Sequence, residues 1–102
     1  MIELTSQTFD SEVISCKIPV VVLWGAAGNV PSNIFAYSLN SYSKILRQPP
    51  KLTRVDVDQS ADLAMRFSIR NVPYLMLFVD GLAMAAESDM TTFMQAAKQW
   101  ID

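Results

Sequence analysis

The segment GAAGNVPS, residues 25–32, follows Trp24 and the short apolar run Val20–Leu23. A strand, a tight loop of small residues and a helix is an arrangement in which many α/β proteins place their chemistry. This segment nevertheless contains no cysteine, histidine, acid or base. The whole chain has one cysteine, Cys16, and no histidine. An intrachain disulfide is therefore impossible, and the commonest general base and metal ligand are missing. The residues alone disfavour an enzyme, and we expect no metal and no other cofactor.

The length, composition and net charge describe a small globular chain. It has 102 residues, of which 51% are hydrophobic and 18% charged. This is enough for one modest core, so we expect one domain over residues 1–102. The net charge of −2 gives no basic excess, which argues against nucleic acid or an anionic membrane as a partner. The start, Met1–Leu4, lacks a basic and an apolar leader region, so we expect a cytoplasmic protein.

The spacing of apolar residues predicts five strands and four helices. One helix begins near Pro31, which suits a first helical turn, and ends before Gln48-Pro49-Pro50. Another follows a cap at Ser88 or Asp89. The other helices are predicted over Ser6–Ser15 and over Ala61–Phe67, the latter capped by Ser60. The strands are predicted at Ile2–Leu4, Val20–Trp24, Leu52–Val57, Tyr74–Val79 and Leu82–Ala86.

The element order is therefore β-α-β-α-β-α-β-β-α. Strands that alternate with helices are expected to be parallel, through right-handed crossovers. The dipeptide Asp80-Gly81 predicts a hairpin between the last two strands. The fold class is α/β, with a mixed sheet that carries helices on both faces.

Several segments in this order resemble thioredoxin, and the resemblance covers nearly the whole chain. They are Phe9-Asp10, Val20–Trp24, Val55–Gln59, Ile69–Leu75 and Leu77–Gly81. The most specific are Ile-Arg-x-Val-Pro-x-Leu, residues 69–75, and the Leu-Phe-x-x-Gly that follows. The resemblance implies the thioredoxin-like fold and a cis bond between Val72 and Pro73.

The chain departs from this family where the family is reactive. The family's active loop reads Trp-Cys-Gly-Pro-Cys. Counting from Trp24 without a gap places its cysteines at Gly28 and Pro31, and keeping the proline in register places them at Asn29 and Ser32. Both alignments stay open, and neither supplies a sulfur. The family's buried acid in the preceding strand falls on Val22. Because thiol–disulfide exchange needs a thiolate, the resemblance then implies a redox-inactive member without oxidoreductase activity.

We therefore expect a non-catalytic protein-interaction module, such as an adaptor, an assembly chaperone or a complex subunit. In the family, the backbone beside the cis proline pairs with an extended peptide, and this needs no cysteine. The alternatives are a glutathione-linked or other enzyme without the cysteine pair, and a structural homodimer. The expected partner is another protein, with a homodimer also open. The predicted binding residues are Gly28, Asn29, Val30, Pro31, Ser32, Asn71, Val72, Pro73, Tyr74, Asp89 and Met90.

Other candidates have plainer roles. We expect Trp24 to brace the loop from below and Cys16 to be a partly buried filler remote from the loop. Arg54 and Asp58 are expected to be solvated charges near strand ends. Methionines 65, 76 and 84 are expected to fill the core or cover the sheet.

Overall fold

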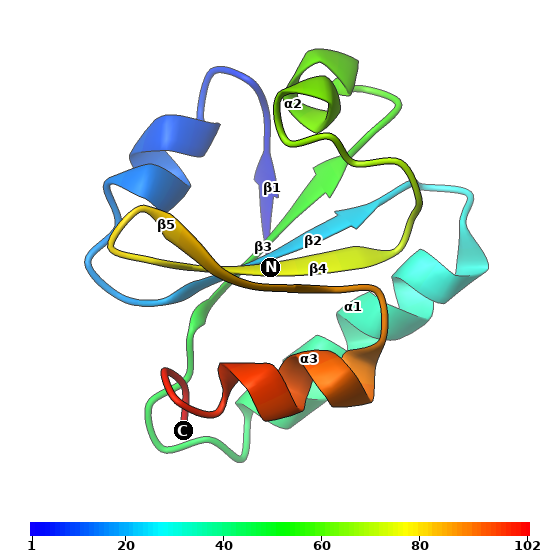
Figure 1. Ribbon diagram of the computed structural model, residues 1–102. Helices are drawn as coiled ribbons and strands as arrows, with labels where there is room; N and C mark the ends of the chain where they lie inside the picture. Colours follow the sequence, from blue (N-terminus) through cyan, green and yellow to red (C-terminus); the bar gives the residue numbers. More distant parts are fainter.

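The strands form one mixed sheet in the order β1-β3-β2-β4-β5. A computed structural model describes residues 1–102 (Figure 1). Strands β1, β3 and β2 are parallel, whereas β4 runs antiparallel to β2 and β5 antiparallel to β4. The predicted α/β fold with a mixed sheet is confirmed. In chain order the elements are β1 (Ile2–Leu4), the π-helix η1 (Asp10–Ile14), β2 (Val20–Gly25), α1 (Val30–Ser43), β3 (Lys51–Asp56), α2 (Ala61–Arg66), β4 (Tyr74–Val79), β5 (Leu82–Glu87) and α3 (Met90–Ala97).

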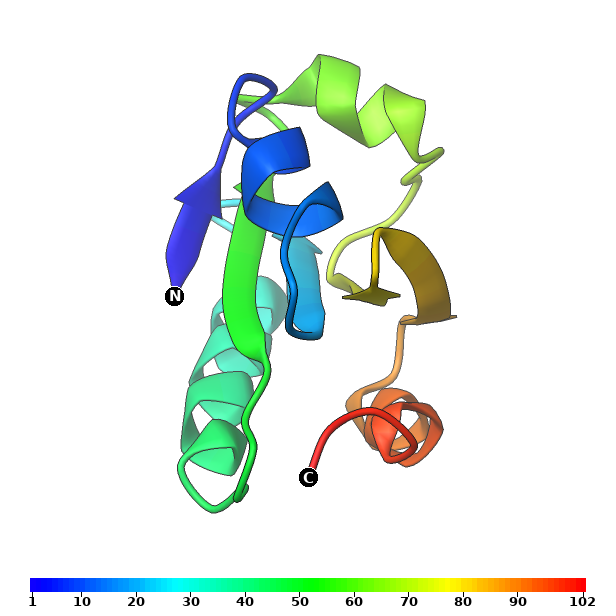
Figure 2. The same ribbon diagram turned by 90° about the vertical axis from the view of Figure 1, so that its left-hand side faces the viewer.

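The central strand β2 reads as a continuous apolar run because both of its faces are covered. All six of its residues are buried. On one face lies an aromatic cluster that includes Phe9, Trp24 and Phe78, and on the other a cluster that includes Leu23, Leu75 and Phe93. Helices η1 and α2 cover the first face and α1 and α3 the second, as Figures 1 and 2 show. Helices therefore lie on both faces, as predicted.

The first helix is shorter than the predicted Ser6–Ser15 and of a different type. The hydroxyl of Thr8 accepts a hydrogen bond from the Thr5 N–H at 2.9 Å, which holds this stretch in a turn. Threonine hydroxyls offer the backbone such alternatives to a helix. The following turn is wide, since the Ser15 N–H donates to the Asp10 carbonyl at 3.0 Å. This bond spans five residues and gives a π-helix.

Helix α1 ends at Ser43, several residues before the prolines that were expected to end it. Beyond it, the N–H groups of Lys44, Ile45 and Leu46 donate to carbonyls three residues earlier, which tightens the chain into turns. Serines 41 and 43 are weak helix formers and lie where the helix stops. The expected side-chain cap by Ser60 was wrong, because its hydroxyl makes no capping bond.

The hairpin between β4 and β5 was correctly predicted. Asp80 and Gly81 have φ values of 52° and 80°, which a two-residue turn with both central residues left-handed requires. Of the three methionines expected in the core or on the sheet, 65, 76 and 84, Met76 is buried and Met84 lies on the outer strand β5. Met65 was wrongly predicted, since its side chain points outward from α2 and is 79% exposed.

Candidate functional site

The loop after β2 is held by its own polar groups. Asn29 is the N-cap of α1, and its Oδ1 accepts hydrogen bonds from the Ser32 N–H at 2.8 Å and from the Ser32 hydroxyl at 2.7 Å. The Asn33 N–H donates to the Asn29 carbonyl at 3.2 Å, and Pro31 has no N–H. The first turn of α1 therefore has few free donors left for a bound anion.

Gly25 lets this loop pass close to the helix. A Cβ placed on Gly25 would lie 2.9 Å from both Cβ and Oγ of Ser32, whereas a Cβ on Gly28 would meet nothing within 4 Å. Ser32 is only 4% exposed. Of the predicted binding residues, Ser32 is therefore placed beneath the surface, and Val30 beside it is exposed.

The segment with the cis proline lies next to this loop. The Val72–Pro73 bond is cis, as the resemblance implied. Tyr74 begins β4 and is the pairing partner of Trp24 at the end of β2, so both connections leave the sheet at one edge. Asn71 is exposed, and Val72, Pro73 and Tyr74 are partly buried.

The third segment, at the start of α3, reaches the same side of the molecule on the right of Figure 1. Asp89 is the N-cap of α3, and its Oδ2 accepts from both the N–H and the hydroxyl of Thr92 at 2.8 Å. The N–H bond and then the hydroxyl bond lower the pKa of Asp89 below its ordinary value of 3.8. The structure thus brings the three predicted segments, 28–32, 71–74 and 89–90, to one edge of the sheet.

No cavity is lined by both the 25–32 loop and the 71–74 segment. One cavity, of about 280 Å³, lies beside the cis-proline segment and is lined by Phe67–Asn71, Tyr74, Met76 and Ser88. Another, of about 180 Å³, lies on the other side of the loop, between α1 and the ends of β1 and β3. The predicted groove is therefore a shallow surface in this structure, with a hollow on each side.

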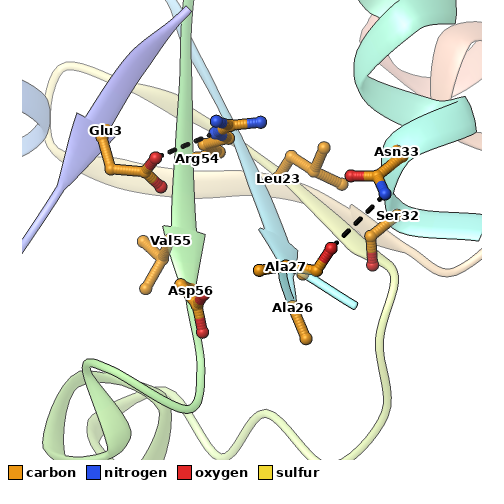
Figure 3. Close-up of a pocket in the computed structure, with 10 residues that line it drawn as sticks. Glu3, Leu23, Ala26, Ala27, Ser32, Asn33, Arg54, Val55 and Asp56 are labelled. Atoms are coloured by element: carbon orange, nitrogen blue, oxygen red, sulfur yellow. Dashed lines mark hydrogen bonds and ion pairs between the residues drawn. The ribbon is translucent and has the colours of Figure 1, made fainter. Parts of the chain in front are cut away.

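The second of these cavities is polar (Figure 3). The Arg54 Nε lies 3.1 Å from Glu3 Oε1, and no other bond of this guanidinium to the protein is present. Asp56 Oδ1 accepts from the N–H groups of Asp58 and Gln59. Arg54 is exposed, as expected of a solvated charge. Its ion pair with Glu3 also lines this cavity, which the sequence did not predict. The signal was the parallel pairing of residues 2–4 with 53–55, which places Glu3 directly beside Arg54.

The only cysteine lies elsewhere. Cys16 is partly buried, packs against the aromatic cluster and precedes β2, whereas the 25–29 loop follows β2. A strand of six residues is about 20 Å long, so the thiol and the loop are at opposite ends of the sheet. Val22, at the position of the family's acid, is fully buried in the aromatic cluster. Trp24 is also fully buried in the aromatic cluster, and its indole N–H has no hydrogen-bond partner.

Comparison with known proteins identifies what the chain is similar to. The thioredoxin family model matches residues 1–101. The chain is 30% identical to "Thioredoxin C-2" of Corynebacterium nephridii, over 85% of this chain and 81% of that protein. It is 31% identical to "Thioredoxin 1" of Synechococcus elongatus, over 76% of this chain and 73% of the relative. It is 32% identical to "Thioredoxin 1" of Chlorobaculum tepidum, over 74% and 75%.

These names contradict two expectations. The chain was expected to be a non-catalytic interaction module, or in the alternative a structural homodimer or another kind of enzyme, and to lack oxidoreductase activity. Relatives named thioredoxin point instead to a redox function. The expectation rested on the missing loop cysteines, on Val22 in place of the family's acid and on the absence of histidine, whereas the likeness to these proteins extends over most of the chain. No helix of the structure has the length and apolar character needed to cross a membrane.

Proposed function

We propose that this chain, which belongs to the thioredoxin family, takes part in thiol–disulfide exchange with other proteins, as one domain over residues 1–102. The observation that carries the proposal is the family match over residues 1–101. It is supported by the retained backbone of the loop edge, where the end of β2, the cis proline and the start of α3 meet. The chain supplies one sulfur to this chemistry, Cys16, because it has no other cysteine.

With one thiol the exchange takes a defined course. The Cys16 thiolate attacks one sulfur of a disulfide in the other protein, forming a new S–S bond while the old one breaks. The second sulfur leaves as a thiolate and takes a proton from water. An external thiol then attacks the mixed disulfide, releases the Cys16 thiolate and is itself oxidised. The two-cysteine cycle, in which a neighbouring thiol resolves the mixed disulfide, is not open to this chain.

The reacting protein binds at the loop edge, through the exposed members of the predicted binding residues. Val30 is 64% exposed there, and Asn71 lies beside the cis proline. The loop edge and Cys16 are about one strand length apart, on the order of 20 Å. A domain-sized partner can span that distance. We propose a cytoplasmic setting, where the reducing environment keeps a single thiol free.

Trapping the mixed disulfide tests the proposal. The folded chain is mixed with insulin in the absence of a reductant, and the masses of the products are measured. We expect an adduct at Cys16 with the wild type and with Ser15→Ala, and none with Cys16→Ser. Ser15 is a fitting control because it is exposed and neighbours the thiol. No adduct under native conditions, with full reaction once urea unfolds the chain, would show the thiol to be inaccessible and overturn the proposal.

A further inference from the structure

A hollow of about 310 Å³ lies between the loop that follows β1 and the segment that leads into α2. These two segments lie side by side at the top of Figures 1 and 2. The hollow contains three carboxylates and no basic side chain, and only one of its lining residues is hydrophobic. Its lining consists of residues 3–7 and of Asp56, Gln59, Ser60 and Asp62. We call this site the acidic hollow, and its charge favours cations over anions.

Two of the three carboxylates have no basic partner. Glu3 is ion-paired with Arg54, whereas no ion pair of Asp56 or Asp62 is present. Asp56 Oδ1 accepts hydrogen bonds from the backbone N–H groups of residues 58 and 59, at 2.9 and 3.3 Å. These bonds orient the carboxylate and occupy one of its two oxygens, but they leave its negative charge without a counter-charge.

Asp62 is held in a similar way by Ser6. The Ser6 hydroxyl lies 2.6 and 2.7 Å from the two carboxylate oxygens of Asp62. A hydroxyl has one proton to donate, so the carboxylate keeps acceptor capacity for a ligand. The hydrogen bond from Ser6 lowers the pKa of Asp62 below its ordinary value of 3.8, so the group is charged at neutral pH.

Ser60 gives an independent reason to expect a ligand. It is only 6% exposed and lines the acidic hollow, and no hydrogen bond of its hydroxyl to the protein is present. The one sealed polar side-chain group without a partner is the Trp24 indole N–H, so the Ser60 hydroxyl opens onto the hollow. Buried polar groups normally have a hydrogen-bond partner. A ligand with N–H donors supplies the partner that this hydroxyl lacks.

The carboxylates are not arranged for a metal ion. No three carboxylate, imidazole or thiol side chains of the structure form a group that could hold one. A hard cation such as Ca²⁺ needs about six to eight oxygen ligands close around it. Carboxylates spread along a hollow suit instead a ligand whose own positive charges are separated by a chain.

We propose that the acidic hollow binds a linear polyamine, which is a methylene chain with two or more protonated amines. One ammonium group pairs with Asp56 and another with Asp62, and the Ser60 hydroxyl accepts a hydrogen bond from one of them. An ammonium group has three N–H donors and no acceptor, which matches the free carboxylate and hydroxyl oxygens of the hollow. A lysine side chain of another protein carries one charge and would leave the second carboxylate unpaired.

The size and exposure of the acidic hollow limit the ligand and its affinity. The volume is at the lower end of the roughly 300–1,000 Å³ found for small-molecule pockets, so the ligand is small. Asp62 is exposed, and exposed ion pairs are weak, so we expect dissociation constants in the millimolar range. The acidic hollow lies at the carboxyl ends of β1 and β3, whereas Cys16 precedes β2. Polyamine binding therefore goes beyond the proposed redox function and does not depend on it.

A titration followed by amide NMR spectra tests the proposal, at an ionic strength held constant with NaCl. The probes are putrescine and spermidine, and butylamine is the control ligand with a single charge. We expect both polyamines to shift the amide signals of Asp58 and Gln59 in a saturable way, because these N–H groups donate to Asp56. Butylamine should bind about two- to fivefold more weakly than putrescine, since it forms one ion pair fewer.

Variants of the lining residues locate the site. Asp56→Asn and Asp62→Asn should each weaken putrescine binding about two- to fivefold, because each removes one ion pair at nearly constant side-chain size. Ser60→Ala should weaken it by a smaller factor. Asp80→Asn is the matched control, because it removes the same charge in the β4–β5 hairpin, at the other end of the sheet. It should bind like the wild type, and so should Cys16→Ser, which separates polyamine binding from the redox function.

Circular dichroism should show that all of these variants are folded. The absence of saturable shifts in the wild type would overturn the proposal, and so would wild-type affinity in both Asp56→Asn and Asp62→Asn. Shifts around Asp80 equal to those around the acidic hollow would also overturn it, since they would show unspecific attraction to a negatively charged chain. Butylamine that binds as tightly as putrescine would contradict a polyamine site and indicate a site for one ammonium group, such as that of a lysine side chain.

Discussion

The two ends of β2 differ in what they have in common with the thioredoxin family. In the family the active loop carries the cysteines, whereas in this chain that loop and the only cysteine lie at opposite ends of β2. At the downstream end, the 25–29 loop, the cis-proline segment and the start of α3 lie on the same side of the molecule (Figure 1), but this end has no cysteine. At the upstream end lies the one thiol, Cys16, after a short π-helix and against the aromatic cluster. One end therefore has the backbone arrangement, and the other has the only cysteine.

This difference shows that the fold does not depend on the cysteine pair. Asn29 holds the loop through Ser32, which is the work of an N-cap and needs no disulfide. Val22 packs in the core where the family has an acid, since a buried carboxylate is costly without a partner. Likeness of fold and presence of a reactive group are separate properties of this chain.

The largest expected effect is at the upstream end. Phe9 is fully buried, and its ring centre lies 5.0 Å from that of Phe67 and 5.7 Å from that of Phe78. Phe9→Ala should lower the free energy of unfolding by about 3–5 kcal/mol, because it removes a large side chain and leaves a cavity. Urea unfolding followed by tryptophan fluorescence measures this. The exposed Met65→Ala should change it by less than about 0.5 kcal/mol. Equal losses for both would mean that the aromatic cluster does not support this end.

At the downstream end, two glycines provide a matched pair. Gly25→Ala should destabilise the fold by about 1–3 kcal/mol, because the new Cβ would overlap with Ser32 and shift the loop. Gly28→Ala meets open space and should be neutral or stabilise by up to about 1 kcal/mol, by restricting the unfolded chain. The same urea experiment compares them. If the two alanines cost the same, the close contact of the loop with α1 is not what holds this end.

The smallest expected effect is a difference in the pH dependence of stability between two N-caps, Asp89 of α3 and Asn29 of α1. Asp89 caps α3 with a charge, and the Thr92 hydrogen bonds lower its pKa, whereas Asn29 caps α1 without one. A lowered pKa in the folded state adds stability above the unfolded value of 3.8, and this stability is lost as the pH falls through the folded pKa. Asp89→Asn should therefore flatten the loss of stability below about pH 4, whereas Asn29→Ser should leave its slope unchanged. An unchanged acid slope in Asp89→Asn would contradict the role of this cap.

Much of the fold follows from the sequence because its local signals agree. The apolar run of β2, the Asp80-Gly81 turn and the cap expected at Ser88 or Asp89 each agree with the structure, where Asp89 is the cap. The extent of the first helix was wrongly predicted because a threonine hydroxyl takes a backbone N–H hydrogen bond in this stretch. Threonine carries little hydrophobic signal from which this could be predicted. The burial of Met65 was wrongly predicted because a short helix has several faces, and composition does not say which one is buried.

The candidate site was less predictable. The three segments predicted to bind a partner do lie on one side of the molecule, but Ser32 was expected to contact that partner, whereas it is buried and its hydroxyl donates to Asn29. The cavity beside Arg54 was missed because its walls come from β1, β3 and the start of α1, which are distant in sequence. Only the register of the parallel strands brings Glu3 to Arg54.

The most direct test of the account is the rate at which dithiothreitol reduces insulin in the presence of this chain, followed as turbidity. The one-thiol proposal predicts a rate above the dithiothreitol blank for the wild type and for Ser15→Ala. It predicts the blank rate for Cys16→Ser. Wild-type turbidity that develops no faster than the blank would contradict the redox function. Equal acceleration by Cys16→Ser would show that the exchange does not pass through this thiol.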